Sequence, residues 1–174
     1  LMDSALSLAI GAIAIAPSQP ETVYVGTGEH NFSSDSFFGV GLYRIDNAST
    51  TADLTGPLNK DASDADVFTG RGISRIIVHP TDPAMIFVAS TTGVGGLLGS
   101  ANVVTPSRGI YRSTNATSAN PVFTKLTGLN GNTNNNVRDI AIDPQNPNLM
   151  VASVVFAANP ATTTSGIYVS NDAM

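Results

Sequence analysis

The residues of this chain that could do chemistry gather in one polar loop, Gly28 to Val40, which follows an apolar, strand-like run. The loop carries two carboxylates, Glu29 and Asp35, and the amide Asn31. Either carboxylate could serve as one of the two acids of a glycoside hydrolase, which lie roughly 5–10 Å apart. The three side chains could also bind Ca²⁺, although this ion usually takes about 6–8 oxygen ligands. The third interpretation is a solvated acidic loop.

Other chemistries find little support in the composition. The chain has no cysteine, which excludes disulfides, thiolate metal sites and a cysteine nucleophile. Its two histidines, His30 and His79, form no pair in the sequence, and His79 precedes Pro80, where we expect a turn. The glycine-rich segment TTGVGGLLGSANVV lacks the Lys-Ser/Thr pair of a phosphate-binding loop.

Charge and hydropathy limit the partners further. Eight Lys+Arg stand against thirteen Asp+Glu, the net charge is −5, and the basic residues are scattered, so we expect no nucleic-acid partner. The apolar run of residues 1–16 is interrupted by Asp3 and is shorter than the roughly 20 residues of a transmembrane helix, so we expect a strand there and no transmembrane segment. Abundant Asn, Thr, Ser and Gly are typical of secreted bacterial β-proteins.

A threefold repeat organises the whole chain. The segments GAIAIAPSQPETVYVGT, SRIIVHPTDPAMIFVAS and RDIAIDPQNPNLMVAS each contain an alternating apolar run, a Pro-x-x-Pro turn and a second apolar run. Their first prolines, Pro17, Pro80 and Pro144, are 63 and 64 residues apart. Each unit continues to a second marker, GLYRIDN, GIYRSTN or GIYVSND. The markers begin at Gly41, Gly109 and Gly166. Two markers in the same order indicate a true repeat.

Each repeat predicts antiparallel strands. Period-two alternation in the first run indicates a half-buried strand, and the prolines indicate a tight turn before a returning strand. The marker predicts a third strand, whose first glycine we expect where another backbone approaches closely. A fourth strand is expected at Phe123 to Leu126 and near Leu54 to Leu58. No segment predicts a helix.

The sequence therefore predicts an all-β fold, a partial β-propeller of about three blades of antiparallel strands. The predicted blades are residues 1–70 with a loop insertion, 71–134, and the start of a third at 135–174. An antiparallel sandwich is the alternative, but a sandwich does not require a repeat. Closed propellers have about four to eight blades, so we expect a fragment of a larger, six- to eight-bladed ring. Its open edges would be covered by remaining blades of the same chain or by another protein subunit.

The marker GIYRSTN, followed by VFTKLTGL, resembles the bacterial neuraminidase or Asp-box repeat. The segment VRDIAIDPQNPNLMVAS resembles the strand pair that accompanies this box in sialidase-like, sortilin-like and xyloglucanase-like propellers. The resemblance implies an extracellular, cell-surface or periplasmic protein, and a structural role for the box residue, which accepts backbone N–H bonds in a hairpin turn. The equivalent residues here are Asn47, Asn115 and Asp172. The box glycine is replaced by alanine, and the closing tryptophan is absent.

The resemblance raises two activities. A sialidase needs three converging arginines, but the Phe/Tyr-Arg-Ile-Pro motif is missing, and Arg44 and Arg112 occupy equivalent repeat positions, which indicates a structural role. Xyloglucanase-like propellers take one carboxylate from an early-blade loop, about where Glu29 lies. Here the acid is displaced by one residue, and its partner would lie outside this chain.

Two functional hypotheses follow. The first is a non-catalytic propeller segment of a secreted or cell-surface bacterial protein, acting as a scaffold or interaction surface for a protein or glycan. The alternative is the N-terminal blades of a glycoside hydrolase, with Glu29 or Asp35 as one acid. In either case Glu29, Asn31 and Asp35 form the candidate ligand- or ion-binding loop, and no cofactor is expected apart from the Ca²⁺ alternative.

Overall fold

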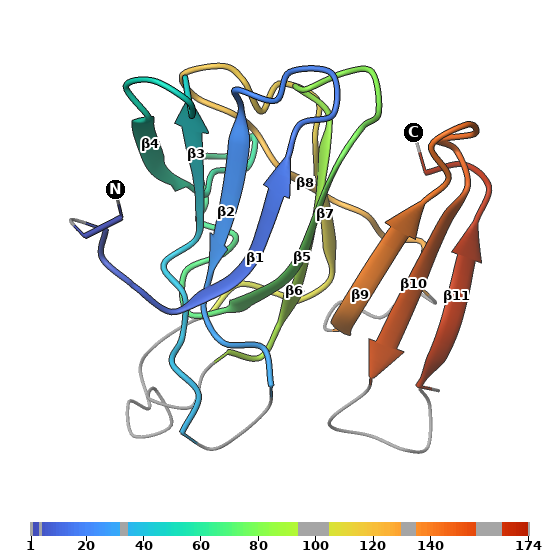
Figure 1. Cartoon of the computed structure of the whole chain (residues 1–174). Coiled ribbons are helices and arrows are strands. Elements are labelled where there is room, and N and C mark those ends of the chain that lie inside the picture. Colours follow the sequence, from blue (N-terminus) through green and yellow to red (C-terminus); the bar gives the residue numbers. More distant parts are fainter. Residues whose placement is uncertain are drawn as a thin grey trace.

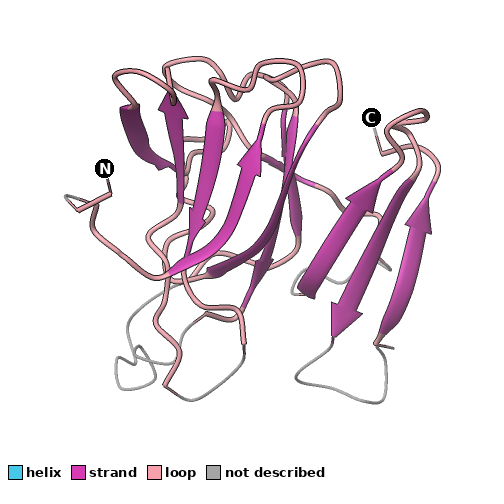
Figure 2. Cartoon of the chain, in the orientation of Figure 1, coloured by secondary structure: helices cyan, strands magenta, loops and turns pink. Residues whose placement is uncertain are grey.

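The computed structural model describes residues 2–3, 5–31, 35–93, 105–129, 135–155 and 165–173. These residues form three antiparallel sheets and, within these ranges, no helix (Figures 1 and 2). The prediction of an all-β chain is thereby confirmed. Among the described residues, no helix is long and apolar enough to cross a membrane.

The strands follow the repeat. The first sheet contains β1 (Ile10–Ile15), β2 (Val23–Thr27), β3 (Leu42–Asp46) and β4 (Asp53–Leu58), side by side in that order. The second contains β5 (Gly72–Val78), β6 (Ile86–Thr91), β7 (Ile110–Ser113) and β8 (Thr124–Lys125), again in order. The third contains β9 (Asn136–Ile142), β10 (Met150–Val155) and β11 (Gly166–Ser170), with β10 in the middle. The strands β4 and β8 lie where the fourth strands were expected.

The N-terminal run is a strand over less of its length than predicted. Strand β1 begins at Ile10, which is paired with Thr27 at the end of β2. Among the residues before it, those that the structure describes have no strand partner. The Ala9 carbonyl still accepts the Gly28 N–H at 2.6 Å, but β2 ends at Thr27, so the segment before β1 does not continue the ladder.

The Pro-x-x-Pro segments form the same turn in all three sheets. The N–H of the residue before the first proline donates across the turn: Ala16 to the Thr22 carbonyl (3.0 Å), His79 to Met85 (2.9 Å) and Asp143 to Leu149 (3.0 Å). We call this end of the sheets the turn end. The opposite end, where β2 leads into the Gly28–Val40 loop and where β5 and β9 begin, is the loop end (Figure 1).

The sheets stack face to face, with one apolar core between the first and second and another between the second and third (Figure 1). The second sheet is therefore covered on both faces, and every residue of β6 is buried. Strand β11 belongs to an end sheet, and its side chains are exposed or half-buried. The difference in burial follows from position in the stack.

The same pair of repeat positions meets at both interfaces between the sheets. At the first, Gly11 lies so close to the carbonyl of Ile73 that a Cβ atom would collide with it. At the second, the Ser74 hydroxyl donates to the carbonyl of Val137. Gly11 and Ser74 occupy equivalent repeat positions, as do Ile73 and Val137. The inner strands of neighbouring sheets thus approach in the same way twice.

The marker glycines differ from the prediction. Gly41 and Gly109 have φ angles of 123° and 151°, in the region that favours glycine. The space of a Cβ atom is occupied by the side chains of Asn59 and Lys125 respectively, and not by another backbone. At Gly166 no described atom lies within 4 Å of that position. The expected close backbone approach was therefore wrong: a side chain from the following segment fills that space at Gly41 and Gly109, and nothing described fills it at Gly166.

Candidate functional site

The candidate loop is closed at its base by Thr27. The Thr27 hydroxyl accepts the N–H groups of Val40 and Gly41, both at 2.9 Å, and donates to the Gly41 carbonyl at 2.7 Å. Ser90 closes the β6–β7 connection similarly, with Oγ at 3.2 Å from the N–H nitrogen of Gly109 and 3.3 Å from its carbonyl. These buried hydroxyls fix where the loops leave the sheets.

Glu29 hydrogen-bonds within its own loop. Its Oε2 accepts the Phe37 N–H at 3.1 Å, and its own N–H donates to the Phe37 carbonyl at 2.8 Å. The half-buried side chain lies at the edge of a largely apolar pocket of about 430 Å³. The other lining residues are Leu6, Ser7, Leu8, Ala9, Phe37, Phe38 and Val40. Glu29 is therefore the only carboxylate among the described residues that line this pocket.

Asn31 and Asp35 are surface residues of the same loop. Both are exposed, neither lines the pocket beside Glu29, and the Asn31 amide oxygen accepts a hydrogen bond from Ser36. Across the described ranges, no three acidic, histidine or cysteine side chains gather in a way that could hold a metal ion. Of the three predicted residues only Glu29 therefore lines this pocket, and a ligand- or ion-binding role for the loop stays a prediction.

His30 connects the loop to the third sheet. Its carbonyl accepts a hydrogen bond from the Arg138 guanidinium of β9. Its Nδ1 atom is buried without a hydrogen-bond partner in the described part of the chain. The contact joins residues 108 positions apart in the sequence, so the loop lies against the third sheet at the loop end.

A cluster of three cations, Arg71, Arg108 and Lys125, lies at the loop end of the second sheet. The buried Arg71 guanidinium bonds to the Pro106 carbonyl, with Nε at 2.7 Å. The Lys125 side chain lies across Gly109, next to Arg108: a Cβ atom there would be 2.9 Å from Cε and 3.7 Å from Nζ. Sequence reasoning considered the arginines singly and missed Lys125.

Burial lowers the pKa of all three cations, and neighbouring charge adds to the shift at Lys125 and Arg71. Burial, followed by the charges of Arg108 and Arg71, lowers the pKa of Lys125 to about 8. Burial and then the charge of Arg108 lower the pKa of Arg71 to about 10. Burial alone lowers the pKa of Arg108. The site is therefore electropositive and poorly hydrated.

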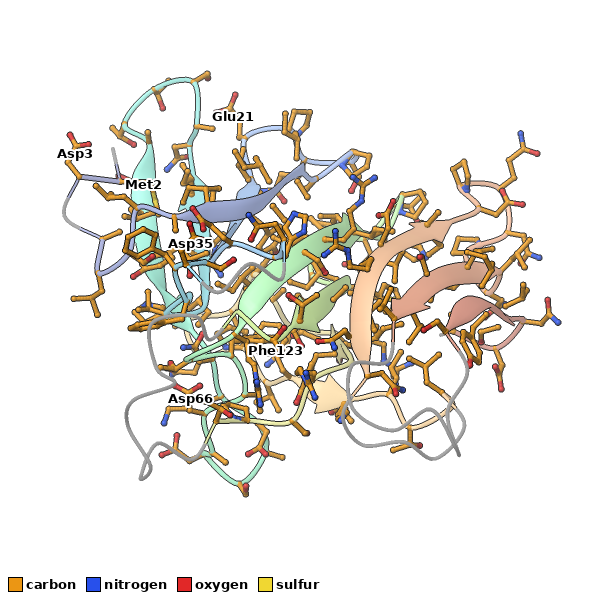
Figure 3. The ribbon with its side chains drawn as sticks, turned by 90° about the horizontal axis from the view of Figure 1, so that it is seen from below. Met2, Asp3, Glu21, Asp35, Asp66 and Phe123 are labelled. Carbon is orange, nitrogen blue, oxygen red and sulfur yellow. The ribbon has the colours of Figure 1, made fainter. Side chains whose placement is uncertain are left out.

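Lys125 lines a pocket of about 450 Å³. Its described lining is Asp61, Ala62, Ser63, Ala65, Asp66, Val67, Pro106, Ser107, Tyr111, Phe123, Thr124 and Lys125. Figure 3 shows the molecule from the loop end, with two of these lining residues, Asp66 and Phe123, labelled. Hydrogen bonds from the Ser63 side chain and from the N–H groups of Ala65 and Ser63 lower the pKa of Asp61. This carboxylate is therefore engaged in its own turn.

The Asp-box positions lie at the turn end, away from this cluster (Figure 1). Asn115 Oδ1 accepts the Val122 N–H at 2.9 Å, which is the bond expected of the box residue. Asn47 differs: its φ is 54°, and its side-chain amide donates to Asp53 at 2.7 Å. Asp172 accepts from the Ser170 hydroxyl at 2.7 Å.

Arg44 and Arg112 join neighbouring sheets at the turn end. Arg44 Nη1 donates to the Ala116 carbonyl of the second sheet's turn at 2.7 Å, and Arg112 Nη1 donates to the Ala173 carbonyl after the third sheet at 3.3 Å. Both acceptors are the alanine that follows the box residue. At the third marker the equivalent residue is Val169, which cannot make this bond.

Comparisons with known proteins leave the family open. No family model matches the chain, and no curated protein matches it. A solved structure titled "The GH43, Beta 1,3 Galactosidase" is 15% identical, with a TM-score of 0.38, over 94% of this chain and 35% of that chain. This chain thus spans about a third of that structure's length. So low a TM-score establishes neither a shared fold nor a shared activity, and the Asp-box resemblance stays a prediction.

Proposed function

We propose that this chain is an arc of a β-propeller and serves as a non-catalytic scaffold in a secreted or cell-surface protein. Its end sheets would pack against further sheets of the same repeat, from remaining blades of the chain or from another subunit. Three stacked sheets that reuse the same contacts at both interfaces support a propeller over a two-sheet sandwich.

The observation that carries the proposal is the exposed face of β1. Ile13 and Ile15 are 65% and 59% exposed, whereas the repeat-equivalent Ile76 and Val78 of β5 are 3% and 6% exposed beneath the first sheet. Side chains of the same type thus become buried as soon as a preceding sheet is present. The first sheet has the surface of a sheet that lacks its neighbour.

The third sheet, at the opposite end of the stack, also has large apolar side chains that are exposed. Ile167 of β11 is 68% exposed, whereas the equivalent Leu42 and Ile110 are 0% and 4% exposed. Val169 is 62% exposed. A sheet packed on this face would therefore bury Ile167, which corresponds to a core position in the first two repeats, together with Val169.

The N-terminal segment covers only part of the first sheet's outer face. Marker tyrosines Tyr111 and Tyr168 pack into the cores that they share with the preceding sheet. Tyr43 packs instead with Met2 and Ala5 of the N-terminal segment. This cover does not extend to Ile13 and Ile15, which remain exposed.

A scaffold role is also supported by the hydrogen bonding and surroundings of the Glu29 carboxylate. Its carboxylate bonds to the loop backbone, and no second described carboxylate faces it across its pocket. The alternative, the N-terminal blades of a glycoside hydrolase, is favoured by the aromatic walls Phe37 and Phe38 beside the same carboxylate. In that case the second acid would come from outside this chain.

Glu29→Gln separates the two functions. In the complete protein we expect hydrolysis of a panel of glycans, if there is any, to remain unchanged, because Glu29 serves only its own loop. A general acid or base typically contributes about 10²–10⁴-fold to the rate. A loss of that size in Glu29→Gln, with Asp35→Asn unaffected as the matched control, would make the chain part of a hydrolase.

A further inference from the structure

One hydrogen bond recurs at the turn end of both interfaces between the sheets. The marker arginine of one sheet, Arg44 or Arg112, donates to the carbonyl of the alanine that follows the box residue of the next sheet. This alanine is Ala116 in the second sheet and Ala173 in the third, and each is buried in the core between the two sheets. The bond has a direction, because the arginine belongs in both cases to the sheet that comes earlier in the chain.

The first sheet presents the same acceptor without a donor. Ala48 occupies the position of Ala116 and Ala173, and like them it donates its N–H to the residue four positions after the first proline of its repeat, here Glu21. The Ala48 carbonyl itself accepts no hydrogen bond from the residues that the structure describes. Ala48 is half-buried, whereas Ala116 is 0% exposed. The outer face of the first sheet thus keeps an acceptor that binds an arginine at both formed interfaces.

The third sheet lacks the donor. Val169 stands where the first two markers have arginine, and it lies on the same exposed face of β11 as Ile167. Valine cannot donate a hydrogen bond, so the third marker cannot form this contact with a following sheet. The two end faces of the stack are both apolar, but only the first has a polar group that distinguishes between neighbours.

Other groups near the turn end do not replace the arginine. The Tyr24 hydroxyl donates to the Pro83 carbonyl at 2.8 Å, but only at the first interface, because the equivalent residue of the second sheet is Phe87. Met2 of the N-terminal segment packs in the same apolar cluster as Ala48 and brings no charge to it. The arginine bond is therefore the contact from which the missing neighbour of the first sheet can be described.

We propose that the outer face of the first sheet binds a sheet of this same repeat whose marker reads Gly-Ile/Leu-Tyr-Arg, with the arginine donating to the Ala48 carbonyl. This inference rests on the proposed packing of the end sheets and adds which sheet fits. Docking would bury Ile13 and Ile15 as the first sheet buries Ile76 and Val78. The third sheet of a second copy has the apolar surface for this contact but lacks the donor.

Val169→Arg tests the proposal, because it gives the third sheet of one copy the arginine that the first sheet of another copy would accept, head to tail. Sedimentation equilibrium of the 174-residue chain measures the self-association. We expect the dissociation constant to fall about tenfold or more relative to the unsubstituted chain, the gain typical of a hydrogen bond that involves a charged group. Adding Ile13→Lys to the same chain should abolish the gain, because it places a charge on the accepting face.

Two matched variants separate the hydrogen bond from charge and size. Ile167→Arg adds the same charge to the same face of β11, and Val169→Met adds length without a donor. Neither should tighten the association. If Ile13→Lys weakens the association of the unsubstituted chain but Val169→Arg strengthens it no more than these controls, the arginine contact is overturned while the packing of the end sheets stands. A gain that survives Ile13→Lys would also overturn the contact, and a single 17.9 kDa species in every variant would overturn both proposals.

Discussion

Phe68→Ala is expected to destabilise the protein by about 3–5 kcal/mol, the usual cost of deleting a large buried aromatic ring. Phe68 follows β4 and is fully buried in the core between the first and second sheets. Its ring meets Tyr111 and Phe123 edge to face, with centroids 5.2 and 5.0 Å away. Its removal leaves a cavity between two sheets and also ends both aromatic contacts, each worth about 0.5–1.5 kcal/mol beyond burial.

Chemical denaturation at one protein concentration measures this effect, with Phe37→Ala as the matched control. Phe37 is 68% exposed, so the same substitution there should change the free energy of unfolding by less than about 0.5 kcal/mol. Similar losses for the two variants would mean that Phe68 does not hold the first two sheets together.

Arg44→Met is expected to destabilise the protein by about 3 kcal/mol. Arg44 Nη1 donates to the carbonyls of Ala116 and Ser118 at 2.7 and 2.8 Å, and Nε pairs with Asp46 at 2.8 Å. Hydrogen bonds from a charged donor contribute about 1.5–3 kcal/mol each, and methionine can replace neither. Because both carbonyls belong to the second sheet's turn, the contact between the sheets should weaken specifically.

Arg75→Met provides the comparison for Arg44. Arg75 pairs with Asp139 at 3.3 Å across the second interface, but the two side chains are 54% and 65% exposed. Exposed pairs typically contribute about 0–1 kcal/mol. A loss at Arg75 as large as that at Arg44, measured by urea unfolding, would contradict the distinction between a buried link and a surface pair.

Much of the fold was predictable because the sequence repeats. Ile13, Ile76 and Ile140 recur at one position with period-two neighbours, and such a pattern by itself indicates a strand. The extent of the first strand was not predictable from hydropathy, since the pairing partner β2 ends at Thr27. Which side chain fills the space beside Gly41 or Gly109 also depends on the path of the following segment, which no local pattern encodes.

The residues of the candidate site were less predictable from the sequence than the fold. Glu29, Asn31 and Asp35 are neighbours in the sequence and attracted attention for that reason, and of the three only Glu29 lines the pocket beside the loop. Arg71 and Lys125 are distant in sequence and meet because the start of β5 and the end of β8 lie at the same end of one sheet. Predicting this cluster requires the strand order. In an antiparallel sheet of four strands, the start of the first strand and the end of the fourth lie at the same end.

The repeat predicted that the turns after the markers are alike, but the structure shows differences in their side-chain hydrogen bonds. Asn115 accepts a backbone N–H, whereas Asn47 adopts a positive φ and donates its amide to Asp53. The alanine that follows each box residue nevertheless donates its N–H to a backbone carbonyl in all three turns. The pairs are Ala48 to Glu21 (3.1 Å), Ala116 to Ala84 (2.8 Å) and Ala173 to Asn148 (3.1 Å). Backbone position is thus kept while side-chain bonding varies.

The central claim is that the end sheets present faces made to pack on further sheets. Multi-angle light scattering of the 174-residue chain tests it over a range of concentrations. We expect self-association that rises with concentration and is reduced by Ile13→Lys combined with Val169→Lys, but not by Phe37→Lys at the equally exposed loop position. A single species of 17.9 kDa at all concentrations, with cooperative unfolding, would contradict the claim.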